Sequence, residues 1–349
     1  MTRRSGSTTI RDVARRAGVS VATVSRYMNH RALISEAVAD RISQVMLEMN
    51  YVPRVAARQL ATPETRAAGL VITNVMNDFF APLINGVASV FSGNNYNLLV
   101  AVSREEIRGR RVPPPIGPQN TDGILVFANC LSEEQLVDLY KIRFPVVLLY
   151  RTSPQNLKIP YVIVENKAST QKMIDHLIEV HDRKRIMFFR GSRDQEDSYW
   201  REQGYLASLA AHGLAIDNNL ILSGEFTHRV AYQALRDYLS KGIRDFDAIF
   251  AGNDDAAAGV MAALGEANIR IPEDVSVVGF DDFRMAPFLQ PALTTVRAPT
   301  ERAGQVAAEQ LSRLFNKESV NQRILLPTEI VIRRSCGCNN HMPDLTKMY

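Results

Sequence analysis

The N-terminal stretch of the chain has the residue spacing of two short helices joined by a tight turn. Thr9 and Asp12 stand three apart, as in a capping box, and apolar residues then recur on one face of a short helix. Gly18 follows this helix and can enter a left-handed turn without steric cost. Ser20 can cap a second helix that carries Val24 inward. The pattern predicts a helix-turn-helix, the layout that places its second helix in the major groove of DNA.

A generic helical hairpin would share much of this spacing, so the residues that follow matter. Ser35 can open a third helix whose apolar residues form one stripe as far as Met49. Pro53 stops that helix and suits the first turn of a new one. Three short helices over about fifty residues can close a small core of their own.

At this point the chain resembles the lactose/galactose repressor family. Asp12-Val13-Ala14, Ala17-Gly18-Val19-Ser20, Thr23-Val24-Ser25-Arg26 and Asn29 match the headpiece of that family. Asn50-Tyr51-Val52-Pro53 and Ala56-Ala57-Arg58-Gln59-Leu60 match its third-helix end and hinge helix, and Val21-Ala22 resembles the galactose-repressor recognition helix. The resemblance covers about residues 8–338 and implies a DNA-binding surface made of Thr9, Ser20, Val21, Ala22, Thr23, Ser25, Arg26, Asn29, Ala57 and Leu60.

The chemistry of these side chains indicates how bases would be read. Arg26, near the middle of the predicted recognition helix, is placed to bond a guanine bidentately, whereas Val21 and Ala22 offer only apolar contact to a thymine methyl. The resemblance also implies a homodimer whose hinge helices, about residues 54–60, order on DNA. The two Leu60 side chains would then wedge into the central step of a near-palindromic operator.

Positive charge is concentrated at the N-terminal end of the chain. The net charge is +4, yet residues 1–62 hold ten Arg, no Lys and four acidic residues, a net of +6. The rest of the chain is slightly acidic, at −2. This distribution predicts phosphate contacts confined to one end of the molecule. A solvated basic surface without a partner is the alternative that charge alone leaves open.

The sequence shows no sign of export or membrane insertion. Residues 1–7 are polar and basic, without the apolar core of a secretory signal, and no run approaches the roughly eighteen apolar residues of a membrane span. Three Cys in 349 residues suit a reducing compartment. We therefore expect a cytoplasmic protein with no membrane partner.

The C-terminal Cys336-Gly337-Cys338, with His341 nearby, raises the question of a metal. The set is short of ligands, and Cys-x-Cys is not the usual Cys-x-x-Cys spacing. We favour a frayed end, with a tail over 339–349, and expect no metal. The sequence also has no G-x-G-x-x-G after a strand and no P-loop, so no cofactor is expected.

From residue 67 the pattern changes to short β-branched runs separated by amphipathic stretches. Alternating β and α elements argue for parallel sheets in an α/β fold, and the length of 349 residues allows two or three domains. The expected strands are 68–73, 97–102, 123–127, 146–149, 161–164, 185–189, 248–251 and 275–280. The expected helices include 81–91, 169–179, 200–212 and 256–267.

The family resemblance supplies an architecture for this part of the chain. It implies a periplasmic-binding-protein-like body of two parallel-sheet subdomains, joined by three crossing strands, with a ligand cleft between them. A headpiece over 1–62 would precede a body over 63–338. The first subdomain would comprise about 63–165 and 294–325, and the second about 166–293 and 326–338, with 328–332 as a final strand.

Polar and aromatic side chains at predicted strand ends are candidates for ligand contact. Asn253 and Asp281 follow strands, where open α/β sheets bind ligands, and both can bond sugar hydroxyls. Arg201 offers a planar fork of donors, while Phe79, Phe80 and Phe226 can cover an apolar sugar face. Taken singly, each has an ordinary alternative as a turn residue or core residue. The resemblance implies that all six line the effector cleft.

Two departures from the family bear on the ligand and the dimer. The purine repressor has an extra arginine six positions before the one matching Arg201; Gln195 stands there in this chain, which favours a sugar or sugar phosphate over a purine. Prolines in the segment 112–118 forbid the helix that the family has there, which puts the local dimer surface in doubt.

The leading hypothesis is a DNA-binding transcriptional regulator, favoured as a repressor, controlled by a small carbohydrate. A solute-binding protein without a DNA role is the rival, but it leaves Thr9–Leu60 unexplained. An enzyme is the weakest alternative, because the sequence has no triad spacing or cofactor loop, and its six His are scattered.

Overall fold

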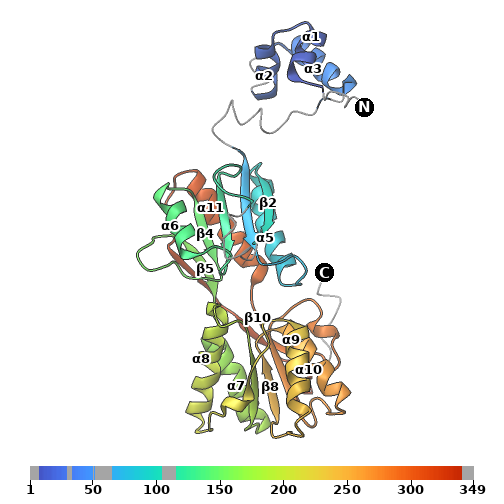
Figure 1. Ribbon diagram of the computed structural model, residues 1–349, viewed down its shortest axis with the longest axis vertical. Helices are drawn as coiled ribbons and strands as arrows, with labels where there is room; N and C mark the ends of the chain where they lie inside the picture. The colour runs from blue at the N-terminus through green and yellow to red at the C-terminus, as the bar shows by residue number, and fades with distance from the viewer. Residues whose placement is uncertain (1–7, 30–33, 50, 52–64, 104–114, 340–349) are drawn as a thin grey trace, which may run out of the picture. The chain divides into compact units, whose positions relative to one another are not determined.

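A computed structural model describes residues 8–29, 34–49, 51, 65–103 and 115–339 (Figure 1). The chain divides into two compact units, residues 1–65 and residues 66–349. The division lies three residues beyond the boundary at 62 expected from the sequence. The proposed hinge, including Ala57 and Leu60, and residues 112–114 of the Pro-rich segment lie outside the described residues.

The first unit has the predicted helix-turn-helix and third helix. α1 (Ile10–Ala17) is followed by α2 (Val21–Asn29) and α3 (Glu36–Glu48). Thr9 and Asp12 form both halves of the capping box, and the hydroxyl of Ser20 accepts a hydrogen bond from the Thr23 N–H at 3.0 Å. The three helices bury a shared cluster of small and branched side chains: Val13, Ala14, Ala17, Val24, Ile42 and Val45.

Gly18 makes the turn between α1 and α2, with φ at +65°. A Cβ built there meets no atom within 4 Å, so a side chain would cost backbone strain alone. We expect Gly18→Ala to lower the free energy of opening of this unit by about 1 kcal/mol, and Gly18→Asn by less, because Asn tolerates left-handed backbone better. Hydrogen exchange of the α1 and α2 amides in the full chain measures this. Equal protection in wild type and Gly18→Ala would contradict it.

The first subdomain of the body is built on a six-stranded parallel sheet in the order β11-β5-β4-β3-β1-β2. α5 and α11 pack against each other beside this sheet. The strands are β1 (Ala67–Ile72), β2 (Asn97–Val102), β3 (Gly123–Phe127), β4 (Val146–Leu149), β5 (Tyr161–Val164) and β11 (Arg323–Leu326). The helices are α5 (Phe80–Gly93), α6 (Glu133–Lys141) and α11 (Thr300–Phe315).

The second subdomain has a six-stranded sheet in the order β12-β10-β9-β8-β6-β7, parallel except for the β10–β12 pair. α7 and α8 cover one face and α9 and α10 the other, each pair closing its own apolar cluster. The strands are β6 (Ile186–Arg190), β7 (Ile221–Ser223), β8 (Ala248–Ala251), β9 (Ser276–Asp281), β10 (Thr294–Arg297) and β12 (Glu329–Val331). The helices are α7 (Lys167–His181), α8 (Glu196–Ala211), α9 (His228–Leu239) and α10 (Asp254–Glu266).

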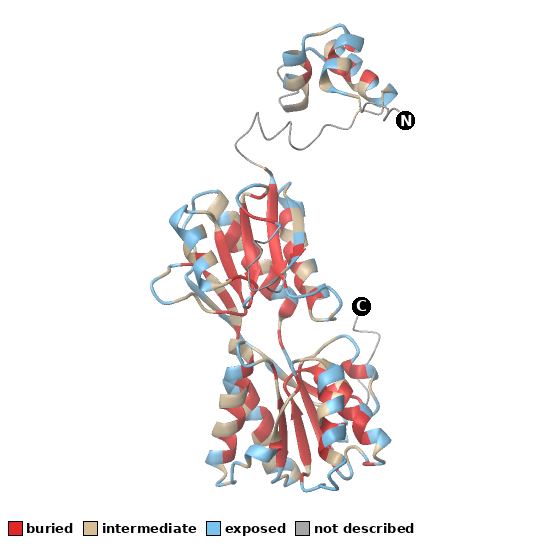
Figure 2. Cartoon of the chain, viewed as in Figure 1, coloured by how far each residue is buried: buried red, intermediate tan, exposed pale blue. Residues whose placement is uncertain are grey.

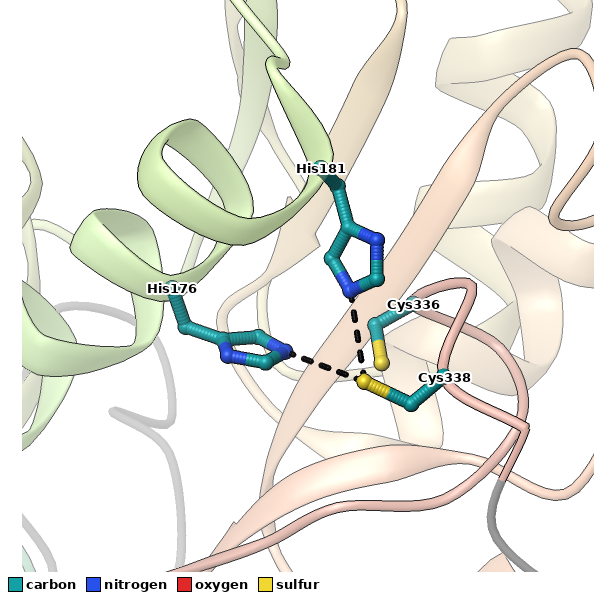
Figure 3. A group of neighbouring side chains, drawn as sticks. All are labelled: His176, His181, Cys336 and Cys338. Atoms are coloured by element: carbon teal, nitrogen blue, oxygen red, sulfur yellow. Dashed lines mark hydrogen bonds between the residues drawn. The ribbon is translucent and has the colours of Figure 1, made fainter.

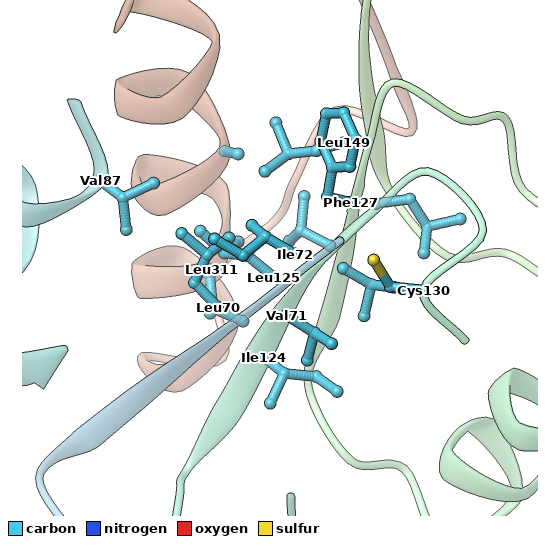
Figure 4. Close-up of a cluster of buried hydrophobic side chains, with 14 of the residues drawn as sticks. Leu70, Val71, Ile72, Val87, Ile124, Leu125, Phe127, Cys130, Leu149 and Leu311 are labelled. Carbon is cyan, nitrogen blue, oxygen red and sulfur yellow. The ribbon is translucent and has the colours of Figure 1, made fainter. Parts of the chain in front are cut away.

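Burial on both faces explains why the central strands were recognisable in the sequence. Every residue of β1 and β3 is buried, and Figure 2 shows the same for the middle of both sheets. Figure 4 shows Leu70, Ile72 and Leu125 packed towards Leu311 of α11. Continuous apolar runs are expected of strands covered from both sides.

One predicted boundary is wrong. The return to the first subdomain was placed at residue 294, but β10 pairs with β9 along Thr294–Arg297 and so still belongs to the second sheet. The chain leaves only after β10, adds α11 and β11 to the first subdomain, and comes back as β12, within the final strand expected at 328–332. The error arose because β10 reads Thr-Thr-Val-Arg, which has no apolar run.

The interpretation of Cys336 to Cys338 as a frayed end is also wrong. Cys336 is fully buried in the cluster under α7 and α8, and Ser335 beside it is buried too. The Ser335 hydroxyl accepts a hydrogen bond from the Thr294 N–H at 2.8 Å and donates one to the Val277 carbonyl at 2.6 Å. This segment is therefore part of the second subdomain.

Among the described residues, none of the helices has the length and apolar character needed to cross a bilayer.

Candidate ligand-binding cleft and DNA-reading helix

The second helix of the first unit presents an outward surface of the expected kind. Ser20, Val21, Ala22 and Arg26 are exposed, while Val24 on the opposite side is completely buried. Thr23 and Ser25 are half-buried, and Thr9 is engaged in the capping box of α1. Asn29 ends the helix, but its side chain is not described. A fixed helix with one arginine and small or apolar side chains facing outward can read base edges in a major groove.

In the body, all six predicted ligand residues line a single cleft. Phe79 and Phe80 stand at the start of α5 in the first subdomain. Arg201 comes from α8, Phe226 from the loop before α9, and Asn253 and Asp281 from the ends of β8 and β9. The cleft is also lined by Thr73, Asn74, Asn77, Phe127, Gln195, Asp197, Glu225 and Thr227. It lies at the carboxyl ends of parallel strands, where such sheets bind ligands.

Arg201 is the centre of the polar contacts in this cleft. It is only 3% exposed, and its Nε donates to Asn166 Oδ1 at 2.8 Å. Its Nη1 donates to the Gly252 carbonyl at 2.6 Å and its Nη2 to Asp281 Oδ1 at 3.3 Å. The guanidinium also lies 3.6 Å from the centre of the Phe280 ring. These contacts fix the guanidinium plane and compensate its buried charge.

Asp281 is held in a conformation that few residues adopt. Its φ is +106°, and that of Asp282 is +56°. Burial raises the pKa of Asp281 to about 6, the positive charge of Arg201 opposes that rise, and the nearby Asp197 adds to it. Strained backbone together with a shifted carboxyl is frequent at binding sites, where the surrounding fold maintains both.

Asp197, one helical turn before Arg201 on α8, belongs to the same cleft. Burial raises its pKa to about 6, opposed by Arg201 and by a hydrogen bond from the amide of Asn166. That bond, from Asn166 Nδ2 to Asp197 Oδ1, is 2.8 Å long. The sequence analysis missed Asp197 and Asn166. The spacing of four between Asp197 and Arg201 on one helix could have indicated Asp197, whereas Asn166 reaches both residues only through the fold.

The aromatic residues form two walls. Phe79 contacts Phe80, Phe127 and Tyr150 with ring centres 5.2 to 5.5 Å apart. Phe226 lies over Gly191, where a Cβ would come within 2.2 Å of its ring. Gly191 is thus needed for the ring to reach the end of the second sheet. Apolar rings on both sides of a polar floor suit a ligand with polar edges and apolar faces.

Asn253 also has a structural role that the sequence did not indicate. Its Oδ1 accepts a hydrogen bond from the Ala256 N–H at 2.9 Å and so caps α10, and its Nδ2 donates to the Phe226 carbonyl at 3.2 Å. One donor and one acceptor position are therefore already used. Asn253 lines the cleft but also holds Phe226 in place.

The two subdomains contact each other beside the cleft. The N–H and the hydroxyl of Thr152, in the first subdomain, donate to Glu196 in the first turn of α8, the hydroxyl at 2.7 Å. Asn129 Nδ2 donates to the carbonyl of Asp194, in the loop before the same helix. These bonds link the first subdomain to the helix that carries Asp197 and Arg201.

Two parts of the chain match known protein families. Residues 9–54 match the family described as bacterial regulatory proteins, lacI family, and residues 174–336 match the periplasmic binding protein-like domain. The chain is similar to the HTH-type transcriptional regulator MalR of Clostridium butyricum, with 30% identity over 94% of this chain and 98% of that protein. The ribose operon repressor of Escherichia coli strain K12 is 30% identical to this chain. The match covers 93% of this chain and 98% of the repressor's length.

A solved structure agrees with these matches. The transcriptional regulator CelR in complex with cellobiose superposes with a TM-score of 0.68 at 27% identity, over 94% of this chain and 99% of that one. The fold and the sequence therefore define a helix-turn-helix transcriptional regulator with a two-subdomain body. The chain belongs to the lacI family of bacterial regulatory proteins, as its resemblance implied.

Proposed function

We propose that this regulator binds a near-palindromic operator as a homodimer and is switched by a neutral sugar held in the cleft. The observation that carries the ligand class is the polar floor made by Arg201 and Asp281, with aromatic walls from both subdomains. Sugar hydroxyls pair with such donors and acceptors, and the less polar ring faces pack on aromatic rings. Two relatives bear names or titles that specify ribose and cellobiose. The protein would act in the cytoplasm, as a regulator and not as an enzyme.

The charge of the cleft favours a neutral sugar over a sugar phosphate. Its described lining has three acidic residues, Asp197, Glu225 and Asp281, against the single cation Arg201. The Arg201 guanidinium already donates to Asn166, Gly252 and Asp281. A phosphate would bring negative charge to carboxylates without a free cation to receive it. Of the two ligand classes expected from the sequence, sugars and sugar phosphates, we therefore favour uncharged sugars.

A thermal-shift panel tests this ligand class. A sugar at a hundred times its dissociation constant stabilises the folded chain by about 2.7 kcal/mol. We expect a shift with one or more uncharged mono- or disaccharides and a much smaller one with their phosphate esters. Stabilisation by a phosphate ester but not by its parent sugar would contradict the proposal, and so would stabilisation by purines alone.

The pKa values in the cleft predict how ligand binding changes with pH. Burial raises the pKa of both Asp197 and Asp281 to about 6, above the usual carboxyl value. The folded state therefore keeps protons that the unfolded chain has lost between about pH 4 and about pH 6. Stability from this pair falls as pH rises through that window.

Sugar binding should show the opposite trend, because an ionised carboxylate accepts stronger hydrogen bonds from sugar hydroxyls than a protonated carboxyl does. We expect the affinity for the sugar to fall below about pH 6, by up to about tenfold per pH unit for each proton taken up. Calorimetry of the intact chain between about pH 5 and about pH 8 measures this. A sugar affinity that is constant across this pH range would mean that neither Asp197 nor Asp281 accepts a hydrogen bond from the ligand.

The roles of Ala57 and Leu60 stay a proposal based on the resemblance. We propose that the hinge orders on DNA and that the paired Leu60 side chains kink the operator at a central pyrimidine–purine step, since such wedges unstack bases. Bending measured by circular permutation of an operator fragment tests this part. A Leu60→Ala variant that bends the operator as wild type does would remove the hinge from the mechanism.

A further inference from the structure

The second subdomain holds a cluster of metal-ligating side chains, none of which lines the cleft. His176 and His181 lie on α7, and Cys336 and Cys338 lie on the segment after β12 (Figure 3). One ligand atom from each residue lies within 4.8 Å of all the others. This is the only such grouping of His, Cys and acidic side chains in the described part of the chain. Neither DNA reading nor sugar binding uses it.

We propose that these four side chains bind one thiophilic divalent transition-metal ion, with zinc as the best fit. A tetrahedral zinc ion, bonded at about 2.3 Å to sulfur and about 2.0 Å to nitrogen, separates adjacent sulfur and nitrogen ligands by about 3.5 Å. Cys338 Sγ lies 3.4 Å from His181 Nε2 and 3.7 Å from His176 Nε2. Two edges of the tetrahedron are thus already in place. Two thiolates with two imidazoles make the donor set of structural zinc sites.

The backbone around the cluster is shaped for this approach. Gly337 has φ at +114°, which side chains rarely allow, and a Cβ there would lie 3.0 Å from His181 Nδ1. Glycine between the two cysteines therefore lets both thiols turn towards the same imidazole. The pair His176 and His181 has four residues between it, within the spacing that zinc fingers use. The two rings stand nearly perpendicular, at 80°, with centres 5.0 Å apart.

Neighbouring groups support the ligands from outside. The Thr294 hydroxyl, on β10, donates to Cys336 Sγ at 3.2 Å, and the Ser276 hydroxyl donates to the Cys336 carbonyl at 2.8 Å. Such bonds orient a ligand and stabilise a thiolate. Cys336 is fully buried, whereas Cys338 and both histidines are partly exposed, which leaves a path for the ion. On binding, the ion replaces the two thiol protons, which leave to solvent.

The position of the site assigns it a structural role. Four protein ligands leave no open coordination position, as in structural and unlike catalytic zinc sites. The ion would join the last described segment to the C-terminal end of α7. The other end of α7 begins next to Asn166, which contacts Arg201 in the cleft, and a helix of fifteen residues is about 22 Å long. The ion therefore clamps the second subdomain without touching the sugar.

A cobalt titration of the intact chain tests the assignment directly. In a phosphine reductant, Co²⁺ should bind with one equivalent per chain and give intense visible bands and a sulfur-to-cobalt charge-transfer band, the signature of a tetrahedral site with thiolates. Zinc should then displace cobalt and raise the thermal midpoint. Weak, octahedral-type spectra would overturn the proposal, leaving thiol–imidazole hydrogen bonds only. A Cys336–Cys338 disulfide that resists reduction would overturn it as well.

Variants locate the ion. Cys338→Ser and His176→Gln should each lower cobalt affinity by about 10- to 100-fold or more, since loss of a ligand exceeds loss of an outer partner. The matched controls are Cys130→Ser, in the first subdomain, and His228→Gln, on α9. Both should bind cobalt as tightly as the wild-type protein does. His341→Gln, outside the described residues, should also keep the metal. Wild-type affinity in Cys338→Ser, or lost binding in His341→Gln, would place the ion elsewhere.

Discussion

Asp281→Asn should lower the affinity for the effector sugar by about 10- to 100-fold, because a hydrogen bond to a charged group contributes about 1.5–3 kcal/mol. Asparagine is chosen because Asp281 has φ at +106°, and asparagine enters positive φ more readily than alanine does. It also keeps an oxygen for the bond from Arg201, which is 3.3 Å away. The loss then reflects the missing charge and not a distorted loop.

Two measurements separate a binding role from a structural one. Calorimetry gives the sugar affinity, and a gel shift without sugar gives the operator affinity, which Asp281→Asn should retain. Asp274→Asn, which alters an exposed carboxylate of the same subdomain, is the matched control. Unchanged sugar affinity in Asp281→Asn would move the effector site elsewhere. Lost operator binding would instead mark Asp281 as a residue that maintains the fold.

Arg26→Ala should remove the preference for the operator over other DNA. A bidentate arginine–guanine contact contributes about 1–3 kcal/mol of discrimination, so the specific affinity should fall by about 5- to 150-fold. Weak, salt-dependent binding should remain, because it comes from phosphate contacts made by the other arginines. Gel-shift competition between the operator and a duplex of scrambled sequence measures this preference.

Arg41→Ala provides the control for charge. Arg41 lies exposed on α3, so its loss removes the same charge from a helix other than the predicted recognition helix. Arg41→Ala should therefore change the salt dependence slightly and leave sequence preference intact. If Arg26→Ala and Arg41→Ala discriminate between operator and other DNA equally well, Arg26 reads no base. The orientation expected for the recognition helix would then be wrong.

Local physics explains which parts of the fold could be read from the sequence. The capping box of Thr9 and Asp12 and the turn at Gly18 involve neighbours in the chain, so residue types alone specify them. The central strands, buried on both sides, appear as apolar runs. β10 was missed because Thr294 and Thr295 are polar, yet both are fully buried. Their hydroxyls have partners distant in the chain, such as Asp254 for Thr295.

The same distinction applies to the cleft and to the cysteine segment. The positions of Arg201 and Asp281 came from the family resemblance, whereas their contact depends on a hydrogen bond across eighty residues. Asp197 and Asn166 were missed because a carboxylate and an amide in a polar stretch look solvated until the fold buries them. Likewise, Cys336 and Cys338 seemed short of ligands because their partners, His176 and His181, are about 160 residues away in sequence.

We infer that a sugar bound in the cleft changes DNA binding by the helix-turn-helix unit. The most direct test of this coupling is the operator affinity of the intact chain with and without the sugar identified by thermal shift. We expect the sugar to change that affinity by about 5- to 150-fold, the usual range of coupling between two sites, and to have no such effect on Asp281→Asn. An operator affinity that is the same with the cleft empty and with the cleft saturated would show that the cleft does not control DNA binding.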